Sequence, residues 1–142
     1  MDFRKLAKLS VAIAHDKKAK DILIIDVRKL TTITDYFVLL SGKSNIHVKT
    51  ISDAIIMAIK NLGVKILHIE GESNARWILL DYGGVIIHIF YEPIRKFYNL
   101  ERLWREGKKV SFKPVNRKIT ERTKSKKRKR KGVKRESKKR TR

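Results

Sequence analysis

Several residue types are missing or scarce in this sequence of 142 residues, which contains no cysteine and only two prolines. Without cysteine, the chain has no disulfides, no thiolate metal ligands and no thiol nucleophile. No apolar run approaches the ~20 residues of a membrane-spanning helix, and the N-terminus lacks the apolar core of a signal peptide. The sequence therefore predicts a soluble, cytoplasmic protein with one ordinary domain.

Acidic residues are also scarce, because 36 Lys and Arg stand against 14 Asp and Glu. Residues 108–142 carry 19 Lys or Arg and 2 acids, a net charge of +17, whereas residues 1–107 carry +5. The stretch 124–140 is too polar to bury enough surface to fold. We therefore expect a domain over 1–107 and a disordered basic tail over 108–142.

Such a tail gains affinity for nucleic acid by releasing counterions from the phosphates. The tail is thus expected to bind a nucleic acid such as RNA, and a solvated tail without function is the alternative. The residues predicted to contact phosphates are Lys126, Lys127, Arg128, Lys129, Arg130 and Lys131.

Apolar periodicity predicts helices and strands in the order αββαβββα. Asp2 and Ser44 are placed to cap two of the helices, and Gly63 stands where a helix is expected to stop. The predicted helices cover residues 3–16, 44–62 and a final piece from Pro93 through Trp104, and the predicted strands cover residues 21–27, 35–42, 64–71, 77–82 and 85–90. The apolar strands indicate an α/β sheet that helices cover.

The segment WILLDYGGVIIHIF, residues 77–90, predicts a β-hairpin that turns at Gly83 and Gly84. Two adjacent glycines favour a type I′ turn, in which both central residues have positive φ. The resulting register pairs Trp77 with Phe90, Leu79 with His88 and Asp81 with Ile86. It places Ile78, Leu80, Val85, Ile87 and Ile89 on one face and Trp77, Leu79, Asp81, Ile86, His88 and Phe90 on the other.

Motifs for chemistry are weak. SGKS, residues 41–44, resembles the end of a phosphate-binding loop, but Phe37 stands where that loop needs a glycine, and a cap at Ser44 explains it better. The four histidines lack metal-ligand spacing, so we expect no metal and no cofactor. His88 is better interpreted as a hydrogen-bonded or interface residue than as a general base.

Seven aromatic residues crowd between residues 77 and 104. Together with Arg76, Arg95 and Arg102, they have the composition of a protein-binding patch. Core aromatics under a covering helix would give the same composition, so both interpretations stay open at this point.

Four segments together resemble the ribosomal silencing factor family, RsfS, also called Iojap. They are KAKDILIIDV (18–27), TDYFVLLSGKS (34–44), EGESNARWILLDYGGVIIHIF (70–90) and RKFYNLERLW (95–104). The resemblance covers about residues 1–106, and the basic tail lies outside the family pattern. Two positions depart from it, since His47 replaces an expected Gln and Gly84 an expected acid.

The resemblance implies a mixed five-stranded sheet flanked by helices, similar to nucleotidyltransferases but without their catalytic carboxylates. It also implies a protein that is not an enzyme and that binds protein fourteen of the large ribosomal subunit, blocks subunit joining and represses translation when nutrients fall. The family positions for partner binding are Trp77, Asp81, Tyr82, His88, Phe90, Arg95, Tyr98, Glu101 and Trp104.

Two other functions remain as alternatives. A nucleotidyltransferase-like enzyme would need paired Asp residues after the Gly42 loop to hold metal ions, and only Asp53, within a predicted helix, follows there. A general RNA-binding or large-subunit assembly factor would act through the basic tail. In that case the domain would serve for dimerisation, and a homodimer of the free protein is left open.

Overall fold

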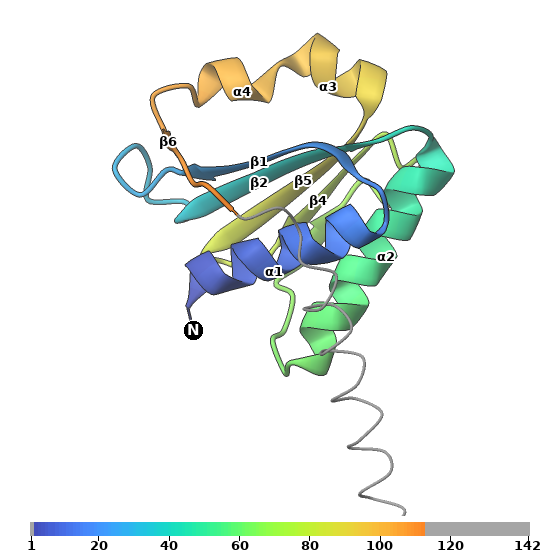
Figure 1. Cartoon of the computed structure of the whole chain (residues 1–142), viewed down its shortest axis with the longest axis horizontal. Helices are drawn as coiled ribbons and strands as arrows, with labels where there is room; N and C mark the ends of the chain where they lie inside the picture. Colours follow the sequence, from blue (N-terminus) through green and yellow to red (C-terminus); the bar gives the residue numbers. More distant parts are fainter. Residues whose placement is uncertain (1, 113–142) are drawn as a thin grey trace, which may run out of the picture.

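The computed structural model describes residues 2–112, in which a mixed β-sheet carries helices on both faces (Figure 1). The elements are α1 (Phe3–Asp16), β1 (Lys20–Asp26), β2 (Tyr36–Gly42), α2 (Asn45–Asn61), β3 (His68–Glu70), β4 (Trp77–Asp81), β5 (Val85–Tyr91), α3 (Glu92–Tyr98), α4 (Leu100–Leu103) and β6 (Lys108–Lys109). Within the described residues, no helix is both long and apolar enough to span a bilayer.

The sheet has six strands in the order β3-β4-β5-β2-β1-β6, one more than the five predicted. The central pair β2 and β5 is parallel, and the other neighbours are antiparallel, so the expected mixed sheet is confirmed. The added strand, β6, pairs with β1 at the edge. Its two residues are too few to show an alternating pattern, which is why the sequence did not predict it.

The predicted helix ends are confirmed. The Asp2 carboxylate accepts the amide of Lys5, and the Ser44 hydroxyl accepts the amide of His47, so each satisfies an otherwise unpaired donor of the first turn. Gly63 follows α2 with a φ of +81°, a conformation that glycine adopts without strain. The final helix, however, is divided into α3 and α4, because Asn99 has a φ of 47°.

The hairpin of β4 and β5 has the predicted register, with Trp77 opposite Phe90, Leu79 opposite His88 and Asp81 opposite Ile86. The turn differs from the prediction. Gly83 alone of the two glycines has a positive φ, as in a type II′ turn, which also joins strands through two residues and leaves the register unchanged.

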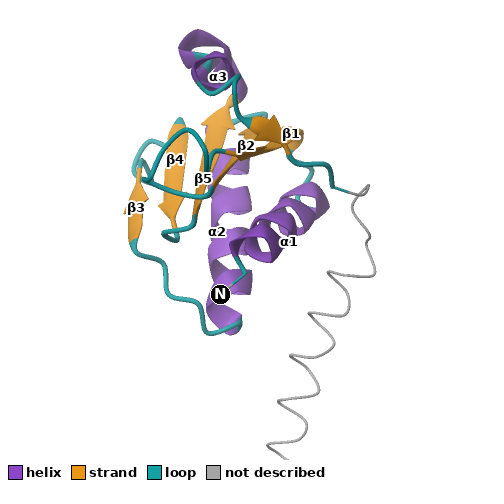
Figure 2. Ribbon diagram, turned by 90° about the vertical axis from the view of Figure 1, so that its left-hand side faces the viewer, coloured by secondary structure: helices purple, strands orange, loops and turns teal. Residues whose placement is uncertain are grey.

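The two faces of the sheet carry separate apolar clusters. Helices α1 and α2 cover one face, where Ile78, Leu80 and Ile87 are fully buried. Helix α3 lies over the other face, as Figure 2 shows from the side. Ile94 of α3, Leu100 of α4 and the following Trp104 pack against the cluster that contains Phe37 and Phe90. The predicted division of the hairpin into two faces is therefore confirmed.

The folded domain continues beyond the predicted boundary at residue 107. The Val110 amide donates to the Ile24 carbonyl at 2.9 Å, and the Val110 side chain is buried in the cluster under α1. Residues 113–142 lie outside the described part of the chain, and so do the predicted phosphate contacts at residues 126–131.

Candidate partner-binding surface

His88 lies at the centre of the hairpin face that α3 and α4 cover. Its side chain is buried, and its Nδ1 atom accepts the indole Nε1–H of Trp77 at 3.1 Å. Nε2 therefore carries the proton of the neutral ring, and it has no hydrogen-bond partner. Burial among the rings of Phe37, Phe90 and Trp77 lowers the pKa of His88 to about 4. The imidazole is thus uncharged at neutral pH and serves as an acceptor for Trp77.

Trp77 connects this buried layer with the surface. Its indole is half-buried and packs at 4.9 Å between ring centroids on Phe90, which is fully buried. On its other side it packs at 5.1 Å on Tyr98, whose side chain is 55% exposed. The aromatic cluster thus extends from the core to α3.

Arg95 fastens α3 to the sheet. Its side chain is buried, and Nη1 donates to the Asp21 carbonyl at 2.5 Å and to the Ser41 hydroxyl at 2.9 Å. Nε lies 3.3 Å from a carboxylate oxygen of Glu101. The guanidinium is therefore used inside the protein, where its hydrogen bonds offset the cost of burying its charge.

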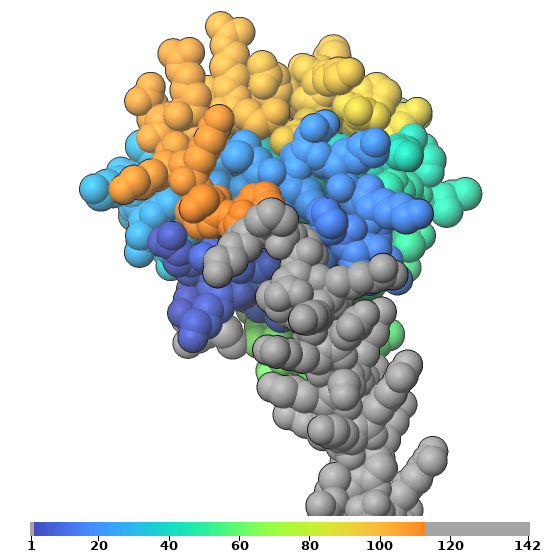
Figure 3. Space-filling view, in the orientation of Figure 1, coloured from blue at the N-terminus to red at the C-terminus, as the bar shows by residue number. Residues whose placement is uncertain are grey.

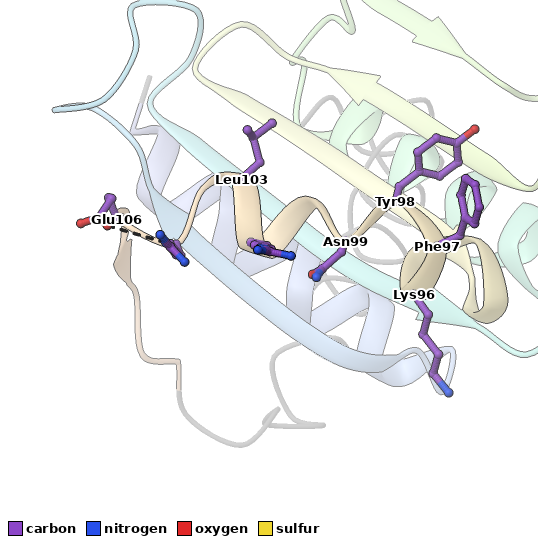
Figure 4. Close-up of a pocket in the computed structure, with 8 residues that line it drawn as sticks. Lys96, Phe97, Tyr98, Asn99, Leu103 and Glu106 are labelled. Atoms are coloured by element: carbon purple, nitrogen blue, oxygen red, sulfur yellow. Dashed lines mark ion pairs between the residues drawn. The ribbon is translucent and has the colours of Figure 1, made fainter.

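An outer surface on α3 and α4 carries large apolar side chains in contact with water. Phe97, Tyr98 and Leu103 are 80%, 55% and 72% exposed, and we call these three residues the outer surface. They line a shallow hollow of about 810 Å³ together with Lys96, Asn99, Arg102, Arg105 and Glu106 (Figure 4). In the space-filling view, α3 and α4 project from the rest of the molecule (Figure 3).

Phe97 and Leu103 are not among the site residues that the sequence predicts. A signal for them exists: Ile94, Leu100 and Trp104 pack inward, so side chains between them on the short helices must point outward. Reading that signal requires knowing which side of α3 and α4 meets the sheet.

Most of the positions implied by the family resemblance gather on one side of the sheet. Those on this side are Trp77, His88, Phe90, Arg95, Tyr98, Glu101 and Trp104. His88, Phe90 and Arg95 are buried there, so contact with a partner is open to Trp77, Tyr98, Glu101 and Trp104, which have accessible surface.

Tyr82 and Asp81 are placed differently. Tyr82 lies in the cluster on the opposite face, under α1, with its hydroxyl unpaired, and burial raises its pKa to about 12. Asp81 is half-buried at the turn and accepts the Gly83 amide at 2.8 Å. A role of the nine residues in partner binding stays a prediction.

The SGKS segment forms a strand end and a helix cap, as preferred from the sequence. A Cβ on Gly42 would lie 2.9 Å from the Val48 side chain, so this glycine allows β2 and α2 to approach closely. Asp53 lies on α2 and pairs with Lys49 at 3.2 Å. Across residues 2–112, no group of three or more His, Asp or Glu side chains is arranged to hold a metal ion.

The two departures from the family pattern each have a structural place. The Nδ1 atom of His47 accepts a hydrogen bond from the Lys43 amide at 2.8 Å, and Nε2 of the same ring lies 2.7 Å from the Lys17 carbonyl oxygen. Gly84 lies against the ring of Phe3, which occupies the space of a side chain. Neither departure disturbs the strands or the helices around it.

Comparison with known proteins identifies similar chains. A family model described as ribosomal silencing factor during starvation, RsfS, matches residues 1–140. The chain is 36% identical over 104 residues to the ribosomal silencing factor RsfS of Bacillus subtilis, which covers 73% of this chain and 88% of that protein. It is 32% identical over 97 residues to the mouse protein named mitochondrial assembly of ribosomal large subunit protein 1, which covers 66% of this chain and 42% of that protein.

A solved structure has the same fold. The crystal structure of a Chromobacterium violaceum protein superposes with a TM-score of 0.72 at 32% identity, covering 82% of this chain and 98% of that one. The family model reaches residue 140. The prediction that the basic tail lies outside the family pattern is therefore wrong for this comparison.

Proposed function

Because the chain belongs to the ribosomal silencing factor family, RsfS, we propose that it binds the large ribosomal subunit in the cytoplasm and keeps it from joining the small subunit. Translation is thereby repressed when nutrients are limiting. The family description refers to silencing during starvation, and the mouse relative is named for assembly of the large subunit. The partner in this proposal is protein fourteen of the large subunit, on the face that meets the small subunit.

The observation that carries this proposal is the outer surface beside Trp77. Three large apolar side chains stay in water on helices that Arg95 and the aromatic cluster hold firmly against the sheet. Exposed apolar groups on a rigid support are typical of protein-binding sites. Bound there, the domain would act as a steric obstacle at the subunit interface, with no chemical step required.

The absence of a catalytic step is itself part of the proposal. A nucleotidyltransferase-like enzyme would hold metal ions between paired carboxylates, whereas Asp53 is exposed on α2 and is paired with Lys49. We expect incubation with each nucleoside triphosphate and magnesium to release neither phosphate nor pyrophosphate. Turnover that copurifies with the protein and disappears in Asp53→Ala would contradict this expectation.

The proposal is tested by sedimentation of the full chain with separated large and small ribosomal subunits. The variant combines Phe97→Ala with Leu103→Ala, because both side chains are largely exposed and their loss spares the core. Truncating an interface anchor costs ~2 kcal/mol or more, so we expect affinity for large subunits to fall by tens of fold. The variant should also fail to block subunit joining, measured by light scattering.

A matched control removes exposed apolar groups from the other side of the molecule. Ile46 and Met57 on α2 are 80% and 56% exposed, and Ile46→Ala combined with Met57→Ala should bind as the unmodified chain does. Equal losses in both double variants would reject the outer surface as the binding site. Recovery of the protein with small subunits alone would reject the proposed function.

Trp77→Ala is expected to weaken large-subunit binding by tens of fold as well. This variant also removes the hydrogen bond to His88 and the packing on Phe90. The binding of Trp77→Ala must therefore be compared with that of the unmodified chain at a temperature where circular dichroism shows that both are folded.

A further inference from the structure

A second hollow, of about 550 Å³, lies between α4 and the strands β1 and β6 at one edge of the sheet. Leu23, Ile25 and Trp104 line it, and its rim carries the exposed cations Arg102, Arg105 and Lys109. We call these three cations with the hollow between them the cationic groove. Figure 4 shows Tyr98 and Leu103 pointing to one side of the α3–α4 segment and Lys96 and Asn99 to the other. The groove adjoins the hollow of the outer surface, because Asn99, Arg102 and Arg105 line both.

The positive charge of the groove is not neutralised within the domain. Arg95 and Glu101 also line the hollow, but they pair with each other at 3.3 Å. Across the described residues, Arg102 and Lys109 form no ion pair. Arg105 has only a 3.8 Å contact with Glu106, and both of those side chains are largely in water, where such a pair contributes little.

One carboxylate, that of Asp21, lines the hollow without such a pairing. Arg102, Arg105 and Lys109 together outweigh this single acid. Within residues 2–112, no ion pair uses the charges of Arg102 and Lys109, and Arg105 has only its weak contact with Glu106. These cations therefore keep their attraction for an anionic ligand.

One residue of the groove, Lys109, lies close in the sequence to the most basic part of the chain. Lys108 and Lys109 form β6, which is held in place by pairing with Asp26 and Ile25 of β1. Residues 113–142, which follow Phe112, contain 17 Lys or Arg and 2 acids. Lys109 of the groove thus precedes this basic segment by only a few residues in the sequence.

We propose that the cationic groove binds successive phosphates of an RNA backbone. An arginine presents planar donors that match phosphate oxygens, and a lysine adds a point charge. Protein partners are instead held by exposed aromatic or apolar anchor residues. The apolar residues of this groove, Leu23, Ile25 and Trp104, are half-buried or buried and do not form such anchors. The inference rests on the proposed function in one respect, since the ribosome would supply the RNA.

In this arrangement the outer surface and the adjoining groove bind different components of the ribosome. The outer surface would select a ribosomal protein, while the groove would hold neighbouring ribosomal RNA. Phosphate contacts add affinity and fix orientation but carry no sequence information. The groove would therefore set how tightly the domain sits on the subunit and how strongly binding depends on salt.

The test uses the full chain and a fluorescein-labelled RNA hairpin, with affinity measured by anisotropy over a series of salt concentrations. The groove variant combines Arg102→Gln, Arg105→Gln and Lys109→Gln. The control combines Lys8→Gln, Lys60→Gln and Lys65→Gln, three exposed lysines on or next to α1 and α2 with the same total charge. On a plot of log affinity against log salt concentration, each lost phosphate contact reduces the magnitude of the slope by ~0.9 on duplex nucleic acid. The slope of the groove variant, which lacks three cations, should therefore be smaller by about 2.7.

We expect the salt slope of the control variant to fall much less than that of the groove variant. We also expect the RNA hairpin to slow amide exchange at residues 100–110 in the unmodified chain but not in the groove variant. Equal slopes for the two variants would overturn the groove as an RNA site. Loss of poly-glutamate binding in the groove variant, with hairpin binding intact, would overturn RNA in favour of an acidic protein. Because the hairpin contains no ribosomal protein, failure here is distinguishable from failure of subunit binding.

Discussion

Acidification is expected to destabilise the folded domain through the single buried imidazole of His88. In the unfolded chain this group titrates near its ordinary pKa of 6.5, whereas in the folded domain its pKa is about 4. The groups that face it are the rings of Phe37, Phe90 and Trp77, and none of them supplies a negative charge. A proton on His88 would thus be buried without a counter-charge.

The sign of the effect follows from the lowered pKa. Above pH 6.5 the imidazole is neutral in both states, and its full contribution to stability is present. Between pH 6.5 and about pH 4 only the unfolded chain binds the proton, so the free energy of unfolding falls as the pH falls. The two pKa values differ by about 2.5, and at roughly 1.36 kcal/mol per pKa unit the total loss is about 3 kcal/mol. Below about pH 4 this contribution is constant.

The assay is urea unfolding, followed by tryptophan fluorescence at a series of pH values. The matched variant is His88→Gln, because a Gln amide oxygen can still accept the Trp77 indole N–H but does not titrate. Subtracting the two curves removes every other titrating group. The difference should change by about 3 kcal/mol across this window. Parallel curves would refute the argument and show that water or a counter-charge reaches His88.

Three further outcomes are expected. Gly84→Ala places a Cβ 2.1 Å from the Phe3 ring and should lower the free energy of unfolding by about 1–3 kcal/mol; an unchanged urea midpoint would show that α1 shifts freely. Arg95→Met leaves the Asp21 carbonyl and the Glu101 carboxylate without their hydrogen-bond donor, so we expect the free energy of unfolding to fall by ~2 kcal/mol. Thermal unfolding measures this loss, and an unchanged melting temperature would contradict it. Deleting residues 113–142 should weaken binding to large subunits at low salt and flatten its salt dependence, while the preference for large over small subunits persists; loss of that preference would place recognition in the basic tail.

The sequence alone determined the hairpin and the division of its residues between two faces. Residues alternate across a strand, and a two-residue turn leaves one register, so Leu79 opposite His88 follows from the position of Gly83 and Gly84. The helix caps at Asp2 and Ser44 were likewise predictable, because capping involves neighbours three residues apart. All of these features depend on contacts close in the sequence.

The sheet order needed the tertiary structure. The parallel pairing of β2 with β5 joins segments separated by α2, β3 and β4, and β6 is a strand only because β1 offers it an open edge. Neither pairing has a local sequence signal, since a parallel neighbour is reached through a long crossover. The break at Asn99 also lacks a local signal, because the helical pattern of the sequence continues through this residue, whereas Asn99 has a φ of 47° in the folded chain.

The candidate site shows the same division. The aromatic and polar residues of the hairpin face were identifiable from residues 77–90, and the sequence left open whether a helix or a partner covers them. The structure places α3 and α4 over His88 and Phe90 and leaves Phe97 and Leu103 in water. The partners of Arg95 lie 74 and 54 residues away at Asp21 and Ser41. Local periodicity thus determined which side chains share a face, but what covers each face depends on contacts between distant segments, which only the folded chain brings together.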